Sequence, residues 1–367
     1  MGVVLAPVNG KGSAARLVEA GAGELYWGFA DAAWTDRFGR YACLNRMSGF
    51  GEEANSLSFE ELLEEVRATR AQEAARADEP AASGAAAAGG AAVADDASAT
   101  ESASAAGAAE PLGLFCTFNS PHYSSEQLRF IAQRYLPQLA QAGLTAVIVS
   151  EPTLIPLARE AGLGAVASTM CSVYNEELAR FYADAGATRI ILPRDLALDE
   201  IERIVAAVPG PSYEVFLMRN GCAFADSHCL GLHRAGCPSL CRSLRTATRW
   251  EIPVADEDGT LAGEGYLARR WEAGTLHRER FHKSACGQCA LWRMEQAGIA
   301  AYKVVGRGDH LDDLATDVAL TERNLRIARC SATHEEYLER MHRPEWLRTL
   351  CHDEGLSCYY PEVRAET

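Results

Sequence analysis

The sequence predicts an α/β fold of the (β/α)8 type, a TIM-type barrel in which eight parallel strands alternate with helices. Short apolar runs alternate with segments of helical periodicity along most of the 367 residues. Strict alternation of this kind requires parallel strands joined by right-handed crossovers. Eight strand segments can be counted, and closing eight strands into a barrel leaves no edge strand exposed, whereas an open sheet would leave two.

The predicted strands are short apolar runs bounded by turn-forming residues. They cover residues 3–6, 24–28, 113–118, 146–150, 165–167, 189–192, 212–217 and 301–305. Apolar residues at helical spacing predict helices at residues 14–20, 59–70, 125–142, 153–161, 176–185, 198–208 and 290–297. Gly143, Gly162 and Gly186 follow three of these helices, at positions where a C-cap is needed.

Two segments interrupt or follow the alternation. Residues 78–110 consist almost entirely of Ala, Gly, Ser, Asp and Glu, so they cannot offset their ordering entropy by burial and are predicted to form a disordered insertion. An expanded surface loop is the favoured interpretation, and a functional tether is the alternative. The predicted organisation is a barrel domain at residues 1–310 and a C-terminal helical extension at residues 311–367, with helices at 311–327 and 333–342.

The charge and the cysteine content limit the possible partners. The formal net charge of −15 opposes non-specific binding of polyanions and favours a small molecule or a protein as substrate, although a local basic patch would still allow RNA. No signal peptide and no apolar run long enough for a membrane span is found, so a cytoplasmic protein is expected. In that reducing compartment the 12 cysteines point to metal binding or catalysis rather than to disulfides.

Six of the thiols form three closely spaced pairs, four of them after the seventh predicted strand, where barrel enzymes place their chemistry. Soft thiolates select zinc, copper(I) or iron–sulfur clusters. The first pair is too widely spaced for a zinc knuckle, which favours an iron–sulfur cluster, while zinc held by the other two pairs is the alternative. The pairs are Cys222 and Cys229, Cys237 and Cys241, and Cys286 and Cys289.

Hydrolytic motifs are scarce in this chain. No Gly-x-Ser-x-Gly elbow occurs, and the segment that begins at His334 has Leu338 where a His-Glu-x-x-His motif needs its second histidine. Cys222 with His228 as its base would give a cysteine-peptidase arrangement, and this is kept as an alternative. The sequence therefore assigns no catalytic residue.

The cysteine stretch resembles the signature of the peptidase U32 family, the collagenase-like proteases. The resemblance departs from the family pattern at residues 219–221 and at position 227, where the family usually has Gly at the first and the last of these positions. The matching residues, with the family's spacing, are Glu214, Phe216, Cys222 and Cys229.

Further segments resemble the family in the same order along the chain, so the resemblance covers most of it outside the insertion. They are residues 5–7 with 20–26, residues 149–152, Ser168 and Thr169 with Asn175, residues 236–242, and the strand from Lys303 to Arg307.

The resemblance implies a barrel and, by analogy with members of the family, a [4Fe–4S] cluster held by four cysteines. Carried over to this sequence, the ligands are Cys222, Cys229, Cys237 and Cys286. Cys241 and Cys289 are adjacent candidates, and Cys43 is similar to an alternative N-terminal ligand of one branch of the family.

The resemblance also carries an expectation about activity. Members are named peptidases, but several act in oxygen-independent hydroxylation of ubiquinone precursors or of nucleobases in tRNA and rRNA. The scarcity of hydrolytic motifs favours hydroxylation or related redox chemistry on a small molecule or nucleobase. Peptidase activity, and a non-catalytic partner with a structural cluster or zinc, are the alternatives. A heterodimer with a second U32-type protein is a further expectation.

Polar residues at the predicted strand ends are candidates for supporting roles. Arg307, Lys303 and Arg194 could hold a carboxylate. The carboxyl groups could transfer protons or could form ion pairs that stabilise the barrel, and the sequence does not distinguish these roles. They belong to Glu24, Glu151 and Glu214.

Overall fold

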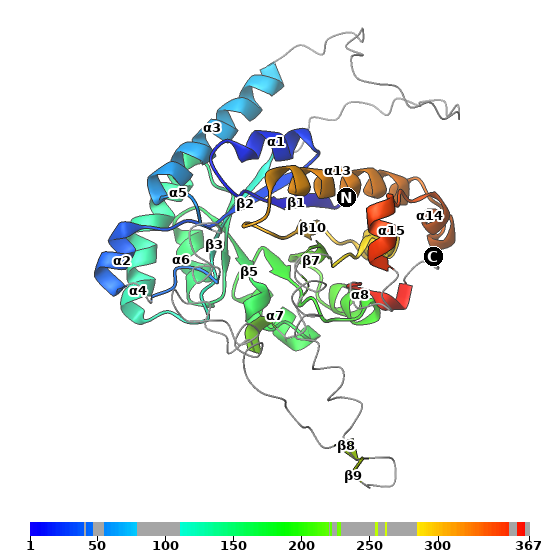
Figure 1. The fold of residues 1–367 in the computed structure, drawn as a ribbon. Coiled ribbons are helices and arrows are strands. Elements are labelled where there is room, and N and C mark those ends of the chain that lie inside the picture. The colour runs from blue at the N-terminus through cyan, green and yellow to red at the C-terminus, as the bar shows by residue number, and fades with distance from the viewer. Residues whose placement is uncertain are drawn as a thin grey trace.

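The computed structural model of the chain describes residues 1–39, 42–46, 55–78, 111–219, 221, 226–228, 254–255, 261–262, 285–351 and 358–363. Eight parallel strands form a closed barrel in the order β1-β10-β7-β6-β5-β4-β3-β2, and helices surround it (Figure 1). The predicted (β/α)8 fold is confirmed. A separate antiparallel pair joins β8 (Val254–Ala255) to β9 (Leu261–Ala262).

Every predicted strand occurs, and each end lies within one residue of the predicted end. Short apolar runs between turn residues are buried on both faces in such a barrel, which makes them easy to recognise. The strands are β1 (Val3–Pro7), β2 (Glu24–Trp27), β3 (Gly113–Phe118), β4 (Ala146–Val149), β5 (Gly164–Ala167), β6 (Arg189–Ile191), β7 (Ser212–Met218) and β10 (Ala301–Val304).

The helices cover the outside of the barrel, with short 3-10 segments at the loops. The α-helices are α1 (Ser13–Glu19), α2 (Ala32–Phe38), α3 (Phe59–Asp78), α4 (Ser125–Phe130), α5 (Leu136–Ala142), α6 (Leu154–Glu160), α7 (Glu176–Asp184), α8 (Leu198–Ala207), α12 (Leu291–Ala297), α13 (Leu311–Arg329), α14 (His334–Arg340) and α15 (Glu345–Cys351). The 3-10 segments are η4 (Thr169–Cys171), η5 (Asp226–His228), η7 (Gln288–Ala290) and η8 (Pro361–Val363).

Three helical features differ from the prediction. The helix predicted to end at residue 70 continues to Asp78, because residues 71–78 are mostly good helix formers. The predicted helix 125–142 is divided by a π-helix, η3 (Ile131–Tyr135); Pro137 follows it and lacks the N–H that a regular helix would use there. Helices α2 and α15 were not predicted. Asp31 caps α2 by accepting a hydrogen bond from Ala33 N.

The main core lies between the barrel strands and the helices. One part of it is a group of contacting aromatic rings around Tyr135, which packs against Phe29, Phe59 and Phe118. Helix α13 packs against β1 and α1. The domain division at residue 310 stays a prediction, and residues 79–110 of the predicted insertion lie outside the described residues.

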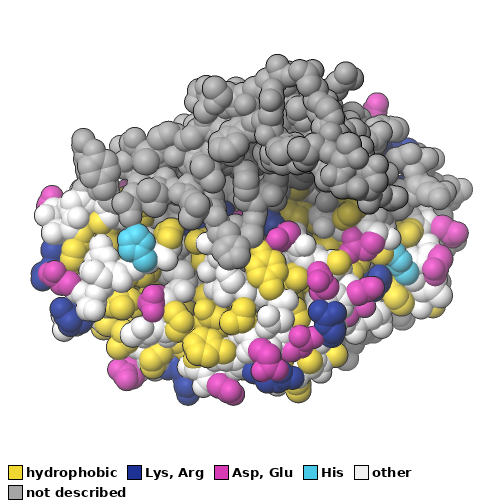
Figure 2. Space-filling model, turned by 90° about the horizontal axis from the view of Figure 1, so that it is seen from below, with side chains coloured by type: hydrophobic (Ala, Val, Ile, Leu, Met, Phe, Trp, Pro, Cys, Tyr) yellow, Lys and Arg dark blue, Asp and Glu magenta, His cyan; other side chains and the backbone are white. Residues whose placement is uncertain are grey.

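The described surface carries both signs of charge. On the face seen from below, acidic and basic side chains are interspersed with apolar ones (Figure 2). Among the described helices, none combines the length and the apolar character that crossing a bilayer requires.

Candidate functional site

The candidate site lies at the end of the barrel where the strands terminate. Because all eight strands are parallel, the loops that follow them meet at one end, here called the mouth. Polar side chains from loops after β2, β3, β5, β6, β7 and β10 contact one another there. The mouth is distinct from a second set of polar residues, which lies inside the barrel.

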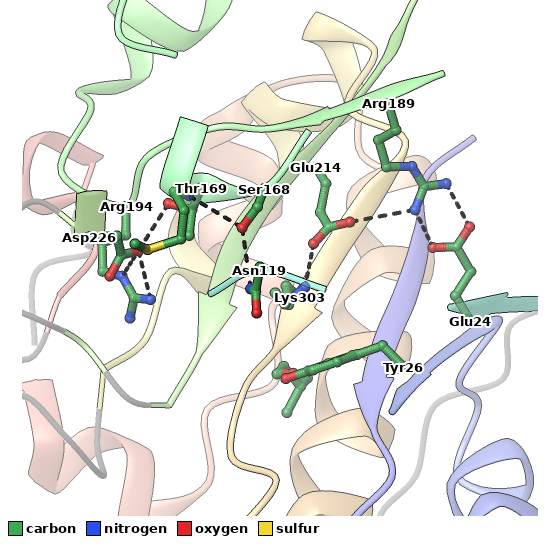
Figure 3. Close-up of polar contacts among 12 residues, drawn as sticks. Glu24, Tyr26, Asn119, Ser168, Thr169, Arg189, Arg194, Glu214, Asp226 and Lys303 are labelled. Carbon is green, nitrogen blue, oxygen red and sulfur yellow. Dashed lines mark hydrogen bonds and ion pairs between the residues drawn. The ribbon is translucent and has the colours of Figure 1, made fainter. Parts of the chain in front are cut away.

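The second set, here called the interior network, joins four charged residues of the barrel strands (Figure 3). Arg189, the first residue of β6, donates two hydrogen bonds of 2.6 and 2.7 Å to Glu24, the first residue of β2. Its Nη1 also lies 3.6 Å from Glu214 Oε2 on β7. Lys303 Nζ donates to Glu214 Oε1 at 2.6 Å and lies 4.2 Å from the centre of the Tyr26 ring.

This network is buried and balanced, with two cations and two carboxylates. Burial raises the pKa of Glu24, although the hydrogen bond from Arg189 acts against the rise. Burial likewise lowers the pKa of Lys303, against the effect of Glu214. Each charge has an opposite charge within ion-pair distance, so the arrangement suits stabilisation of the barrel interior.

At the mouth, Asp226 is the centre of a second ion-pair group, here called the Asp226 cluster (Figure 3). Its carboxylate lies 2.5 Å from Arg46 Nη1 and 2.9 Å from Arg194 Nη2, and it accepts a 2.9 Å hydrogen bond from Thr169 Oγ1. Burial alone would raise the pKa of Asp226, but the two guanidinium groups lower it to about 2. Asp226 is therefore ionised at neutral pH.

The Asp226 cluster fixes η5, which lies between Cys222 and Cys229 in the sequence, onto the barrel. Thr169 belongs to η4, and the hydroxyls of Ser172 and Ser227 form a second contact between the same two segments. The Arg194 guanidinium also lies 4.1 Å from the centre of the Phe216 ring on β7. Together these contacts hold Asp226–His228 against η4 and against Arg194 in the loop after β6.

Arg307, three residues beyond β10, has a different environment at the mouth. It is 4% exposed. Its Nη1 donates to Thr117 Oγ1 at 3.1 Å and to Asn55 Oδ1 at 3.4 Å, and its Nη2 donates to Asn45 Oδ1 at 3.3 Å. Asn45 also donates to Asn55 Oδ1 at 2.9 Å, so the two amides support each other.

The structure shows how an arginine is accommodated at position 219, one of the positions where the chain departs from the U32 signature. Its φ is 65°, in the left-handed region that a glycine adopts more readily, and the family usually has Gly at this position. Its guanidinium contacts Asp317 and lies 3.6 Å from Asp309, and Tyr359 donates a hydrogen bond to its carbonyl. These contacts hold an arginine in a conformation that disfavours it.

The described part of the proposed cluster site consists of Cys286 and Cys289, which are both buried. Residue 286 forms backbone bridges to Met218 at the end of β7 and to Cys358, and its Sγ accepts a 3.4 Å hydrogen bond from Gln288 N. Directly paired residues in a ladder place their side chains on the same side. The structure thus brings Cys358, which belongs to none of the three closely spaced pairs, beside a candidate ligand.

The structure describes only some of the other cysteines that the sequence proposes as ligands. Four candidates lie outside the described residues, and no group of three metal-binding side chains occurs within the described part of the chain. Cys43 is half-buried, in the same 42–46 segment as Asn45 and Arg46. Ligation by any of these thiols stays a prediction. The four candidates are Cys222, Cys229, Cys237 and Cys241.

Several residues of the mouth were not singled out from the sequence. Asn45, Asn55 and Thr117 contact Arg307, and Asp226 binds two arginines. Thr117 lies within a predicted strand, and the other three lie in long segments after strands, so no local pattern marks them. Glu151, which was singled out, accepts a 3.1 Å hydrogen bond from Thr153.

Comparison with known families identifies the chain. The family model described as peptidase family U32 matches residues 97–361, so the chain belongs to this family. A solved structure of a U32 peptidase aligns with 12% identity over 59% of this chain and 69% of its own, with a TM-score of 0.39.

Two Escherichia coli proteins are similar over part of their length. The tRNA hydroxylation protein P is 31% identical over 38% of this chain and 31% of its own length. The 23S rRNA 5-hydroxycytidine C2501 synthase is 29% identical over 48% of this chain and 25% of its own length. The chain thus matches about a third or less of the length of these relatives.

Proposed function

We propose that this chain is an iron–sulfur protein that takes part in oxygen-independent hydroxylation of a nucleobase or a small molecule. The observation that carries the proposal is the similarity to two U32 relatives that are named for hydroxylation of tRNA and of 23S rRNA. Those names make a nucleobase in RNA the first substrate to test. The net charge of −15 would then require RNA contacts that are local.

The described residues supply some of the ligands that an iron–sulfur cluster needs, but not all of them. Cys286 and Cys289 offer soft thiolate sulfurs, and the Gln288 N–H that donates to Cys286 Sγ is the kind of hydrogen bond that tunes cluster sulfurs. Cys222, Cys229 and Cys237 would supply the other ligands, with Cys241 and Cys289 as the adjacent candidates. Cys358 joins them because its backbone pairs with that of Cys286.

The protein residues at the mouth have roles that can be derived without the cluster. Asp226 binds Arg46 and Arg194 and so positions η5, which separates the first two proposed ligands in the sequence. Burial of this ion-pair group strengthens its hydrogen bonds and so keeps η5 in place. When bound, an iron–sulfur cluster would supply electron transfer or Lewis acidity at the mouth.

The experiments below also test two alternatives to the hydroxylation proposal. The family's description favours peptidase activity, with Cys222 as nucleophile and His228 as base. The second alternative is a non-catalytic protein that holds a structural cluster or zinc and works beside a second U32-type protein.

The first experiment identifies the metal. The full chain is purified without oxygen, and its absorption, iron, sulfide and zinc are measured. We expect a broad band near about 400 nm and iron and sulfide in roughly equal amounts. Cys286→Ala should lose most of the iron, whereas Cys330→Ala, which alters an exposed cysteine, should keep it. Zinc without sulfide would contradict the proposal.

The second experiment identifies the reaction. RNA from cells with and without the gene is digested, and its nucleosides are compared by mass spectrometry. We expect one hydroxylated nucleoside to disappear with the gene and to return with the wild-type chain but not with Cys286→Ala. Cleavage of casein or gelatin by the purified chain, lost in Cys222→Ala with the metal content unchanged, would support the peptidase instead. If the RNA is unaltered, the quinone pool of the same cells is compared.

A further inference from the structure

We propose that Arg307 anchors a binding site for a small oxyanion, a carboxylate or phosphate group, at the mouth of the barrel. The inference is independent of the iron–sulfur cluster, because it depends only on described residues around Arg307. It separates this arginine from the other basic residues at the strand ends, which the sequence treated alike.

The first argument is the absence of a counter-charge. Lys303 binds Glu214, Arg189 binds Glu24, and Arg194 binds Asp226. Arg307 is as deeply buried as these, but among the described residues it forms no ion pair with a carboxylate. A buried cation without an opposite charge is costly, and an anionic ligand would offset that cost.

The second argument is the way the guanidinium is held. A Cβ added to Gly28 would lie 1.4 Å from Arg307 Nη1, so the guanidinium lies directly against the Gly28 backbone. Thr117, Asn55 and Asn45 hold it with neutral oxygens. The position therefore requires a glycine after β2, and it fixes the direction of the guanidinium before any ligand binds.

The third argument is the remaining donor capacity. A guanidinium carries five N–H donors, of which the three hydrogen bonds use two on Nη1 and one on Nη2. The second N–H of Nη2 and that of Nε form no hydrogen bond to any described residue. In a guanidinium, the Nε–H and a neighbouring Nη N–H form a pair of donors that matches the two oxygens of a carboxylate or a phosphate.

Burial decides in favour of a small ligand. At 4% exposure, Arg307 would be reached by a compact anion that enters the mouth more readily than by a phosphate in a continuous RNA backbone. A compact anion held by this one buried guanidinium is compatible with the acidity of the whole chain, because the contact is local.

Thermal unfolding of the full chain tests the site. Inorganic phosphate, malonate and a short RNA oligonucleotide are titrated separately at constant ionic strength. We expect the Tm to rise with phosphate, with malonate or with both, as mass action requires for a ligand that binds the folded state. The stronger response identifies the oxyanion class.

The variants decide whether Arg307 is responsible. Arg307→Met should weaken the apparent affinity about tenfold or more, because it removes the charge-assisted hydrogen bonds. Without ligand, its Tm should equal or exceed that of the wild type, since a costly buried charge is gone. Gly28→Ala, which displaces the guanidinium, should weaken binding too if Arg307→Met does not fold. Arg180→Met, at an exposed arginine, should bind like the wild type.

Three outcomes would overturn the proposal. One is a Tm that does not respond to either small anion. A second is an equal response in the wild type, Arg307→Met and Gly28→Ala. The third is an Arg307-dependent response to the RNA oligonucleotide alone, which would assign the arginine to RNA binding.

Discussion

The interior network and the surroundings of Arg307 place buried cations in the same barrel, but only the interior network pairs them with carboxylates. Lys303 and Arg189 each lie within ion-pair distance of Glu214, and Arg189 also binds Glu24 through two hydrogen bonds. Arg307 is held by two amides and a hydroxyl. A burial measurement alone would treat these cations as equivalent.

The difference teaches how buried charges can be sorted into roles. A buried ion pair with several hydrogen bonds satisfies itself, so it contributes to a defined structure and has little capacity left for a ligand. A buried cation with neutral partners is only partly compensated and gains from an incoming anion. The four predictions below test this distinction, beginning with the largest expected effect.

Removing one charge from the interior network should be strongly destabilising. Glu214→Gln leaves Lys303 without its buried partner, which costs about 3–5 kcal/mol of unfolding free energy. Chemical denaturation measures the loss. The double variant Glu214→Gln with Lys303→Met should recover part of it, because the uncompensated cation is removed as well. A loss below about 1 kcal/mol in the single variant would contradict the distinction between paired and unpaired buried cations, because pairing would then contribute little to stability.

The buried ion pair of Arg219 and Asp317, at the rim of the mouth, should make the stability of the protein depend on pH. Burial raises the pKa of Asp317 to about 6, although Arg219 acts against the rise. A folded pKa above the unfolded value means that this carboxyl favours folding most when protonated. Its contribution therefore falls as the pH rises from about 4 to about 6.

Arg219→Gly relieves the positive φ of residue 219 but leaves Asp317 without its cation. We expect a net loss of about 1–3 kcal/mol at pH 8 and a much smaller loss at pH 5, where Asp317 holds its proton. Denaturation at both pH values measures the difference, and adding Asp317→Asn should remove it. A variant more stable than the wild type at both pH values would show that backbone strain dominates.

The Asp226 cluster should give a pH dependence of the opposite sign. The folded pKa of Asp226 is about 2, below the unfolded value, so its ion pairs stabilise the protein above about pH 4 and are lost as the pH falls towards 2. Asp226→Asn should therefore cost about 2 kcal/mol at pH 7, with the difference from wild type shrinking below pH 4. A constant difference from pH 7 to pH 3 would contradict the assignment.

The smallest effect is expected at an exposed pair. Lys11 and Glu64 lie 3.4 Å apart with side chains 62% and 63% exposed. Solvent screening limits such a pair, so Lys11→Ala should change the unfolding free energy by no more than about 0.5 kcal/mol. The variant serves as the baseline for the buried pairs. A larger change would mean that pairing itself, rather than burial, decides the cost.

The strands could be predicted from the sequence because each is a short apolar run between turn residues. The partners of buried charges could not. Lys303 lies within the last strand of the barrel, whereas Arg194 and Arg307 follow strands, and the sequence gives all three the same status. Only the closed barrel reveals that Glu214 and Asp226 bind the first two and that Asn45, Asn55 and Thr117 surround the third. These partners lie many residues away, so no local pattern records them.

The cysteines illustrate the same limit. Spacing along the chain singled out Cys286, but Cys358 pairs with it across a distance of 72 residues in sequence (358 minus 286). Helix α2 was missed because it is short and its capping residue, Asp31, is a single polar position. Local signals therefore define the barrel, and the assembly of its mouth depends on contacts between distant loops.

The pairing of residue 286 with residues 218 and 358 has a consequence for the order of folding. Tyr359 N donates to Cys286 O, Arg219 N donates to Ala285 O, and the Tyr360 hydroxyl donates to Phe216 O. These bonds close long loops, and the entropy lost on closure grows with loop length. We expect amide protons at this rim to gain protection from exchange later than those of β3 and β4, which are close in sequence.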